Sequence, residues 1–150
     1  MKIRLANQTD IDDVLAWRND PLSRSMFRSK GLVALEEHRK WFLASLAEPS
    51  RVLYIGLEGE QKIGICRFDY DNAADSAEVS INMNPQERGK GYAVPFLRKA
   101  IEAYARESDC ELIAQIFKEN LVSRKVFERC GFEFVDDDGT LLHYQRKAFV

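Results

Sequence analysis

The sequence has few of the residues that build disulfide frameworks, metal centres or membrane spans. Its 150 residues include three cysteines, which are widely spaced at Cys66, Cys110 and Cys130, and only two histidines. An odd number of scattered cysteines argues against a disulfide framework and against a zinc site, so we expect no metal and a reducing compartment. No apolar run is long enough to span a bilayer, and the first residues lack the apolar core of a secretion signal. We therefore expect a cytoplasmic protein with no membrane partner.

The sequence also lacks an excess of charge of one sign. It has 22 lysines and arginines against 24 aspartates and glutamates, for a net charge of −2. Because binding to nucleic acid usually requires a basic face, we expect no nucleic-acid partner. Hydrophobic residues make up 45% of the chain, and no linker, repeat or low-complexity segment interrupts it. We therefore expect one compact domain over residues 1–150.

Alternating and amphipathic segments predict an α/β fold. Strands are expected at 2–5, 51–57, 62–69, 77–83, 111–117, 132–135 and 141–147, and helices at 9–19, 34–46, 92–107 and 120–130. Thr9 or Asp10 is expected to cap the first helix. Residues 22–33 are basic and have no clear period, which predicts an irregular or partly helical segment. The order β-α-α-β-β-β-α-β-α-β-β indicates a mixed, mostly antiparallel sheet of about seven strands with four helices.

The stretch 82–93 joins a cleanly alternating strand to the most amphipathic helix of the chain. Gly89 and Gly91 lie there beside two cations, Arg88 and Lys90. The first N–H groups of a helix have no intrahelical partner, and glycine lets the backbone approach a ligand closely. The stretch therefore predicts a site for a phosphate or pyrophosphate. The alternative is a strand–turn–helix unit whose glycines serve turn geometry alone.

Two motifs, in this order, resemble those of the GCN5-related N-acetyltransferase (GNAT) family. The family's Gln/Arg-x-x-Gly-x-Gly/Ala turn is matched in two registers, one starting at Gln86 and one at Arg88. Family members usually place this residue three positions after a proline, so Pro85 favours the register that starts at Arg88. Residues 120–132 resemble the family's Asn-x-x-Ser/Ala…Tyr/Phe-x-x-x-Gly-Phe helix. The resemblance covers essentially the whole chain and implies the GNAT fold and N-acetyl transfer from acetyl-CoA.

The resemblance implies that acetyl-CoA binds along the end of the fourth strand, the glycine turn and the second motif. The implied residues are Ile81, Asn82, Met83, Arg88, Gly89, Lys90, Gly91, Tyr92, Ala93, Asn120, Ser123 and Phe127. Asn120 can also be a simple N-cap, and the two roles can coexist. Many family members carry a tyrosine as general acid at the position of Phe127. A phenyl ring cannot protonate a leaving thiolate, so that role is not carried over.

Four residues are candidates for acid–base chemistry during attack of an amine on the acetyl thioester. Glu78 lies on the polar face of its strand and is the first candidate to accept the amine proton, with His38 the second. Ser123, Tyr144 or a water are candidate donors to the leaving thiolate. The structural alternatives are a cross-strand ion pair for Glu78, a half-buried core position for His38 and a first-turn position for Ser123. His143 is expected to be structural.

The N-terminal third is expected to bind a small-molecule amine acceptor. The candidate substrate-binding residues are Trp17, Arg18, Asn19, Met26, Phe27, His38 and Trp41, beside basic Arg24 and Arg28. This arrangement resembles the GNAT branch that acetylates nucleotide-linked amino sugars, as in the pseudaminic acid pathway. Aromatic rings can stack on a base or sugar, and arginines can bind a diphosphate. The alternative is that Trp17, Trp41 and Phe42 are core residues and the arginines are solvated.

Other functions within the same resemblance stay open. An acetyltransferase for protein N-termini, similar to the ribosomal-protein enzymes, is one alternative, and a non-catalytic acetyl-CoA-binding module is another. The basic segment speaks mildly against the first, and Phe127 keeps the second in consideration. The sequence leaves the oligomeric state undecided, with a homodimer among the alternatives.

Overall fold

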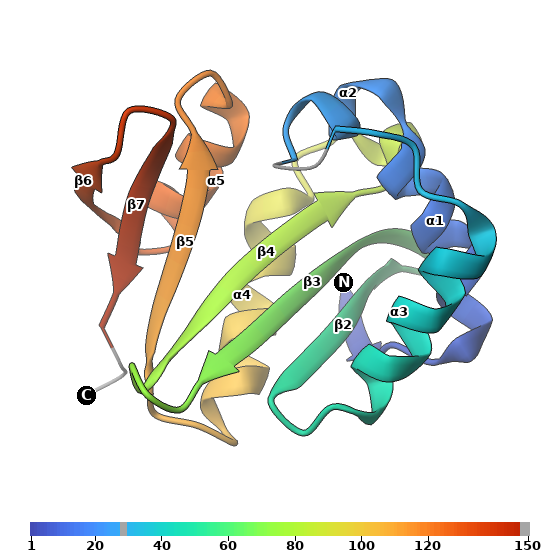
Figure 1. Ribbon diagram of the computed structural model, residues 1–150, viewed down its shortest axis with the longest axis horizontal. Helices are drawn as coiled ribbons and strands as arrows, with labels where there is room; N and C mark the ends of the chain where they lie inside the picture. The colour runs from blue at the N-terminus through green and yellow to red at the C-terminus, as the bar shows by residue number, and fades with distance from the viewer. Residues whose placement is uncertain (28–29, 148–150) are drawn as a thin grey trace.

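A seven-stranded mixed sheet forms the centre of the computed structural model, which describes residues 1–27 and 30–147 (Figure 1). The strands are β1 (Lys2–Leu5), β2 (Arg51–Glu58), β3 (Gln61–Asp71), β4 (Ser76–Met83), β5 (Glu111–Phe117), β6 (Glu133–Asp137) and β7 (Leu141–Arg146). Their spatial order is β1-β2-β3-β4-β5-β7-β6. All neighbours are antiparallel except β4 and β5, which are parallel. The predicted mixed, mostly antiparallel sheet is confirmed.

The described residues form five α-helices, one more than expected. They are α1 (Ile11–Asn19), α2 (Pro21–Ser25), α3 (Leu35–Ala47), α4 (Ala93–Ala105) and α5 (Leu121–Arg129), with short 3₁₀ turns at Gln8–Asp10 and Pro85–Glu87. The additional helix, α2, lies at the start of the segment expected to be irregular or partly helical. Pro21 fits its first position, where a missing N–H costs little, and Asp20 caps it by accepting from the Ser23 N–H at 3.1 Å. Arg28 lies outside the described residues.

No helix in the described ranges is both long enough and apolar enough to cross a membrane.

The start of α1 differs from the expectation. Asn7 caps the preceding 3₁₀ turn by accepting from the Thr9 N–H at 2.9 Å, and Asp10 makes no side-chain cap bond to α1. The buried Asp10 carboxylate instead accepts two hydrogen bonds of 2.8 Å from Arg4 and lies 2.7 Å from Lys62 Nζ. Asp10 therefore occupies the predicted N-cap position of α1, but its carboxylate ties α1 to β1 and β3 and makes no capping hydrogen bond.

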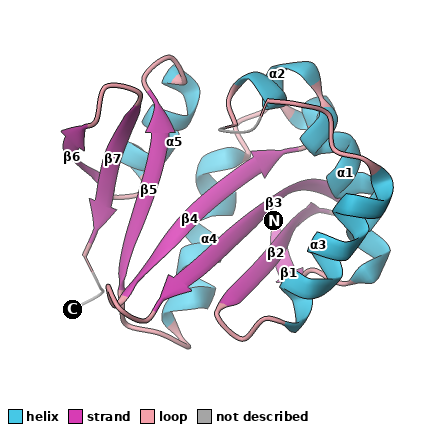
Figure 2. Cartoon of the chain, viewed as in Figure 1, coloured by secondary structure: helices cyan, strands magenta, loops and turns pink. Residues whose placement is uncertain are grey.

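Alternating strand residues send two apolar cores to opposite faces of the sheet (Figure 2). Helices α4 and α5 cover the face we call the α4 face, whose core includes Phe68, Phe96 and Phe127. Helices α1 and α3 cover the opposite face, the α3 face, whose core includes Trp17 and Phe42. Helices α1 and α3 lie over the β1–β3 side of the sheet. The α3 face of β5, β6 and β7 therefore has no helix over it in the described structure.

The parallel strands β4 and β5 separate along their length (Figure 1). Their ladder pairs Ser76 with Glu111, Ala77 with Leu112 and Glu78 with Ile113, and it extends no further, although β4 continues to Met83 and β5 to Phe117. We call the diverging part, residues 79–83 of β4 and 114–117 of β5, the β4–β5 fork. Because the chain passes from β4 toward α4 and from β5 toward α5, both helices begin at the open end of the fork.

Candidate active site

The turn that follows β4 has its glycines in conformations that other residues rarely adopt. Gly89 and Gly91 have φ angles of 75° and 78°, and a Cβ added to either would meet no atom within 4 Å. Asn84 anchors the start of the turn, since its side chain accepts from the Gln86 N–H at 3.1 Å and donates to the Lys62 carbonyl at 2.9 Å. The turn is thus fixed at its base, while the space outside its glycines is open to a ligand.

Helix α4 begins beside these glycines without a side-chain cap. Tyr92 is its N-cap residue and makes no side-chain hydrogen bond to the first turn. Pro95 has no N–H, and the Phe96 N–H donates to the Tyr92 carbonyl at 3.0 Å. The backbone N–H groups of Ala93 and Val94 thus have no side chain to cap them, and the helix dipole favours an anion there. The geometry from Gly89 to Ala93 fits the predicted pyrophosphate of acetyl-CoA.

The two cations of the turn differ in how they are held. Lys90 is half-exposed and bonds Glu87 Oε2 at 3.0 Å, and this hydrogen bond raises the pKa of Lys90. Arg88 instead directs Nη2 to α2, where it donates to Asp20 Oδ2 at 2.8 Å and to Ser23 Oγ at 2.6 Å. The Arg88 side chain was expected at the pyrophosphate, but this amino group is bonded to α2.

On the other side of the fork, α5 presents the second motif. Asn120 accepts from the Ser123 N–H at 3.1 Å, so its N-cap role is confirmed, and Ser123 lies in the first turn. Phe127 is buried and packs edge-to-face on Phe132, with ring centroids 5.0 Å apart. Phe127 is therefore a core residue of the α4 face, where it supports α5.

Residues at the end of β4 divide between the two faces of the sheet. Ile81 and Met83 pack against the core of the α4 face. Asn82 pairs with Ile65 of β3 on the α3 face, and its Oδ1 accepts from Ser23 Oγ at 3.2 Å. These three residues thus line the β4 side of the fork, as the resemblance implies.

Charged and aromatic side chains gather on the α3 face beside the fork. The residue opposite Glu78 in the β3–β4 ladder is Asp69, and Asp69 is paired with Arg67 at 2.9 Å. The Trp41 ring lies on the same face, with the guanidinium carbons of Arg67 and Arg51 at 5.4 and 5.8 Å from its centroid. Arg67 and Asp69 were not among the expected site residues, although strand alternation and the hairpin register place both beside Glu78.

Three expected acceptor contacts are used by the fold itself. Trp17 is buried in the core of the α3 face. Both ends of the Asn19 amide bond the backbone of Val33, at 2.9 and 2.8 Å. His38 is buried with Nε2 3.1 Å from the Ile11 carbonyl, and burial lowers its pKa. The structure therefore gives these residues structural roles and does not present His38 as an acid–base group.

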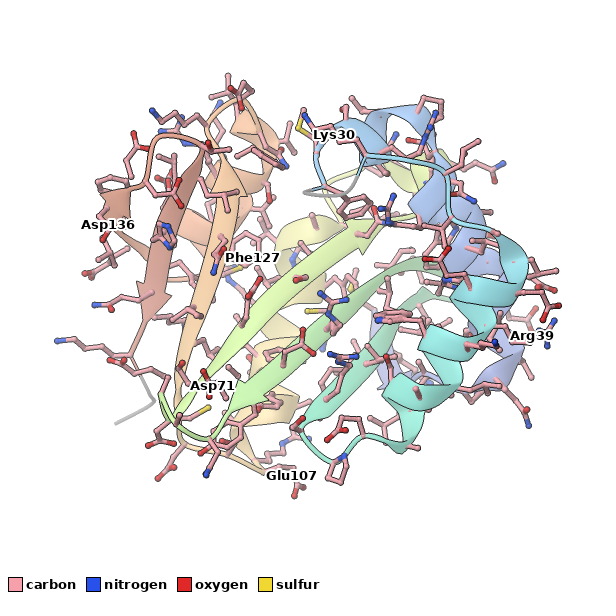
Figure 3. The ribbon with its side chains drawn as sticks, in the orientation of Figure 1. Lys30, Arg39, Asp71, Glu107, Phe127 and Asp136 are labelled. Carbon is pink, nitrogen blue, oxygen red and sulfur yellow. The ribbon has the colours of Figure 1, made fainter. Side chains whose placement is uncertain are left out.

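The remaining acceptor candidates lie in and after α2. Met26 ends α2, and the guanidinium carbon of Arg18 lies 4.3 Å from the centroid of the Phe27 ring. Burial is the larger cause that lowers the pKa of Arg18, and the positive charge of nearby Arg24 is the second cause. Lys30 reaches β5, where its Nζ lies 5.2 Å from the Phe117 ring centroid (Figure 3). Phe27 and Lys30 thus contact residues of α1 and β5, respectively.

A cavity of about 400 Å³ lies along β5, β6 and β7, and His143 lies on its wall. His143 Nε2 is 2.9 Å from Asp138 Oδ2. Backbone N–H groups, and then His143, lower the pKa of Asp138 to about 2. Tyr144 also lines the cavity, but its hydroxyl donates to Glu128 Oε2 of α5 at 3.1 Å. His143, which was expected to be structural, lies at the wall of a cavity next to the fork.

The fold and this site define a member of the GNAT family. The family model described as Acetyltransferase (GNAT) domain matches residues 1–133, and the chain belongs to that family. It is therefore an acetyl-CoA-dependent N-acetyltransferase.

Three relatives illustrate the range of this similarity. The chain is 26% identical over 139 residues to Acetyltransferase PseH of Campylobacter jejuni, covering 91% of this chain and 85% of PseH. It is 32% identical over 138 residues to a Bacillus subtilis protein named "Putative phosphinothricin acetyltransferase YwnH", covering 88% and 83%. The crystal structure of ribosomal-protein-alanine N-acetyltransferase from Brucella melitensis superposes with a TM-score of 0.83 at 23% identity, covering 98% and 99%. This last likeness concerns the fold alone.

Proposed function

We propose that this enzyme transfers the acetyl group of acetyl-CoA to the primary amine of a nucleotide-linked amino sugar. Two observations favour an acceptor of this kind. The chain is similar to Acetyltransferase PseH, and its N-terminal third resembles the GNAT branch that acetylates nucleotide-linked amino sugars. The segment beside the fork also combines an arginine on an aromatic ring, Arg18 on Phe27, with Lys30 close to Phe117. Cations and aromatic rings together suit a diphosphate joined to a base and a sugar.

The residues of the glycine turn are proposed to bind acetyl-CoA. The N–H groups of Gly89 to Ala93 would bind the pyrophosphate, with Lys90 adding charge. Asn120 and Ser123 flank the fork from the α5 side, where the pantetheine arm is expected. When bound, acetyl-CoA supplies an activated thioester carbonyl. The residue whose position carries this assignment is Gly91, because its left-handed backbone opens the turn next to an uncapped helix.

Glu78 is proposed to accept the proton of the attacking amine, directly or through a water. It lies at the last residue pair of the β4–β5 ladder, on the same face as Asn82 and Trp41. The Asn84 N–H donates to the Ile63 carbonyl of β3, so in this register the N–H of Asn82 also points to β3 and that of Met83 points into the fork. The Met83 N–H is therefore proposed to donate to the thioester oxygen. A sugar amine or an α-amine titrates near about pH 8, so a weak base positioned at Glu78 is sufficient near neutral pH.

The second candidate acceptor is phosphinothricin, because YwnH is the more identical of the two curated relatives. Arg67 and Arg51, on the α3 face, provide cations for the anionic groups of such an amino acid. This alternative keeps the fold, the turn and Glu78 in the same roles and changes only the acceptor contacts.

Release of free CoA thiol with three acceptors tests the proposal. We expect a UDP-linked 4-amino-4,6-dideoxy sugar to give turnover at least about a hundredfold faster than phosphinothricin or peptides starting with Ala or Ser, since a site that hydrogen-bonds its own acceptor strongly rejects acceptors that leave those groups unpaired. Faster turnover of phosphinothricin would support the second candidate. Faster turnover of the peptides would replace the sugar with a protein N-terminus.

A further inference from the structure

A chain of hydrogen bonds joins the cofactor turn to helix α2. Arg88 Nη2 donates to Ser23 Oγ at 2.6 Å, and Ser23 Oγ donates to Asn82 Oδ1 at 3.2 Å. The same Arg88 nitrogen bonds Asp20 Oδ2 at 2.8 Å, and Asp20 caps α2 through the Ser23 N–H. These residues come from three separate parts of the sequence, with α2 on one side and the end of β4 and the turn on the other.

The direction of each hydrogen bond in this chain is fixed by chemistry. Arginine can only donate, so the Ser23 oxygen must accept from Arg88, and its own hydrogen is free to point at Asn82. Asn82 therefore directs its amide oxygen toward α2, which turns its NH₂ group away from Ser23. Ser23 is buried, and the side chain of Asp20 is 21% exposed, so the contacts are partly shielded from water. Charge-assisted bonds of this kind are stronger than neutral ones.

Helix α2 is also the element that leads into the proposed acceptor segment. We call Met26 and Phe27, which directly follow α2, the acceptor segment, and the guanidinium carbon of Arg18 lies 4.3 Å from the centroid of the Phe27 ring. The turn at Gly89 to Ala93 and the acceptor segment are consequently attached to one another through Arg88, Asp20 and Ser23.

We propose that Arg88, Asp20 and Ser23 are positioning residues that couple acetyl-CoA binding at the glycine turn to the ordering of α2 and the acceptor segment. This inference rests on the proposed function, and it assigns to the Arg88 side chain a role on the acceptor side. Binding at the turn restrains the Arg88 backbone, the guanidinium restrains Asp20 and Ser23, and α2 then opens less often. The acceptor meets a segment that is already in place, so the two ligands bind with positive coupling.

Hydrogen exchange in the presence and absence of acetyl-CoA tests the coupling without any acceptor. In the wild-type enzyme, saturating acetyl-CoA is expected to slow exchange of the amides of 21–26 about fivefold or more, along with those of 89–96. In Ser23→Ala and in Arg88→Gln, the slowing at 89–96 should persist, while that at 21–26 should fall below about twofold. The double variant should behave like either single variant, because both remove the same connection.

Controls separate this inference from the proposed function. Arg39→Gln removes an exposed arginine at the outer side of α3 and should retain the wild-type pattern (Figure 3). With the acceptor that turns over fastest, Ser23→Ala should raise the acceptor KM about tenfold, while the acetyl-CoA affinity measured by calorimetry without acceptor should stay within about twofold, a split that general destabilisation would not give. Equal slowing at 21–26 in the wild type and both variants would overturn the coupling. If calorimetry detects no acetyl-CoA binding to the wild-type enzyme, the proposed function fails first.

Discussion

The carboxylate of Asp10 is fully buried and contacts Arg4 of β1 and Lys62 of β3. Burial alone would raise its pKa, but hydrogen bonds from Arg4, from Lys62 and from the Asn7 N–H outweigh that effect and hold the pKa well below its usual range. A folded-state pKa below the unfolded value of about 4 means that ionised Asp10 stabilises the fold above that pH. The stabilisation is lost progressively as the pH falls below about 4 toward the folded-state pKa.

Asp10→Asn is therefore expected to lower the free energy of unfolding by about 3 kcal/mol near pH 7, because it leaves two cations without their buried anion. Urea unfolding at pH 7 and pH 3 measures this, and the difference from wild type should shrink at pH 3. The matched control is Asp13→Asn, since Asp13 also bonds Lys62, at 2.9 Å, but is half-exposed. The control should cost less than about 1 kcal/mol. An equal cost for both variants would contradict the importance of burial at Asp10.

At the scale of elements, the glycine turn allows a test that separates strain from ligand binding. Gly91→Asp should lose most acetyl-CoA affinity, at least about a hundredfold by calorimetry, because a carboxylate would occupy the space proposed for the pyrophosphate. Gly59→Asp is the matched control, because Gly59 also has a positive φ, 61°, with nothing within 4 Å, in the hairpin turn between β2 and β3. Both variants should lose about 1–2 kcal/mol of stability from left-handed strain. Unchanged affinity in Gly91→Asp would show that the turn is not the cofactor site.

Local patterns predict most elements because each follows from neighbouring residues. Strand β4 was expected from strict alternation, and α4 from its apolar stripe after the turn. Helix α2 was not predicted as a separate helix, because Pro21 is as consistent with the end of one helix as with the start of the next. The 3₁₀ cap at Asn7 was missed for a similar reason, since Asn7, Thr9 and Asp10 are all good caps and only tertiary pairing selects among them.

At the scale of the whole molecule, strands β2 and β3 contribute to both cores. Leu53 and Ile65 face α1 and α3, whereas Tyr54 and Cys66 face α4 and α5. A loss of packing on one face therefore destabilises strands β2 and β3, which also form part of the core on the other face. We expect unfolding to be a single cooperative transition.

Phe42→Ala tests this cooperativity, because Phe42 is fully buried in the core of the α3 face. It should lower the free energy of unfolding by about 3–5 kcal/mol without changing the denaturant slope. Tryptophan fluorescence reports the α3 face through Trp17 and Trp41, and far-UV circular dichroism reports the whole sheet, so the two transitions should coincide. Leu43→Ala, at a 42% exposed position on the same helix, is the control and should cost under about 1 kcal/mol. A fluorescence transition at lower urea than the dichroism transition would indicate two independent units.

Contacts between distant parts of the chain explain what the sequence could not provide about the site. The turn, its glycines and the Asn120 cap follow from local spacing and were predicted in place. The Arg88 contact with Ser23 spans 65 positions, and no local period reveals it. The helical spacing put His38 on one face with Trp41 and Phe42, but it could not show that Nε2 meets the Ile11 carbonyl. Similarly, nothing local places His143 at a cavity wall.

The early end of the β4–β5 ladder gives the sheet two inner edges in addition to its outer ones. An edge strand has unpaired N–H and C=O groups that can pair with a strand of another protein and cause aggregation, so native proteins usually protect such edges. Here the inner edges converge at the pair formed by Glu78 and Ile113, and a flanking strand lies beside each of them. A full polypeptide strand needs about 4.8 Å of spacing on each side along its whole length, which a converging gap cannot provide. A slender extended molecule with only a few amide groups does not need this spacing. The inner edges of the sheet are therefore accessible to a small ligand of that shape but not to another strand.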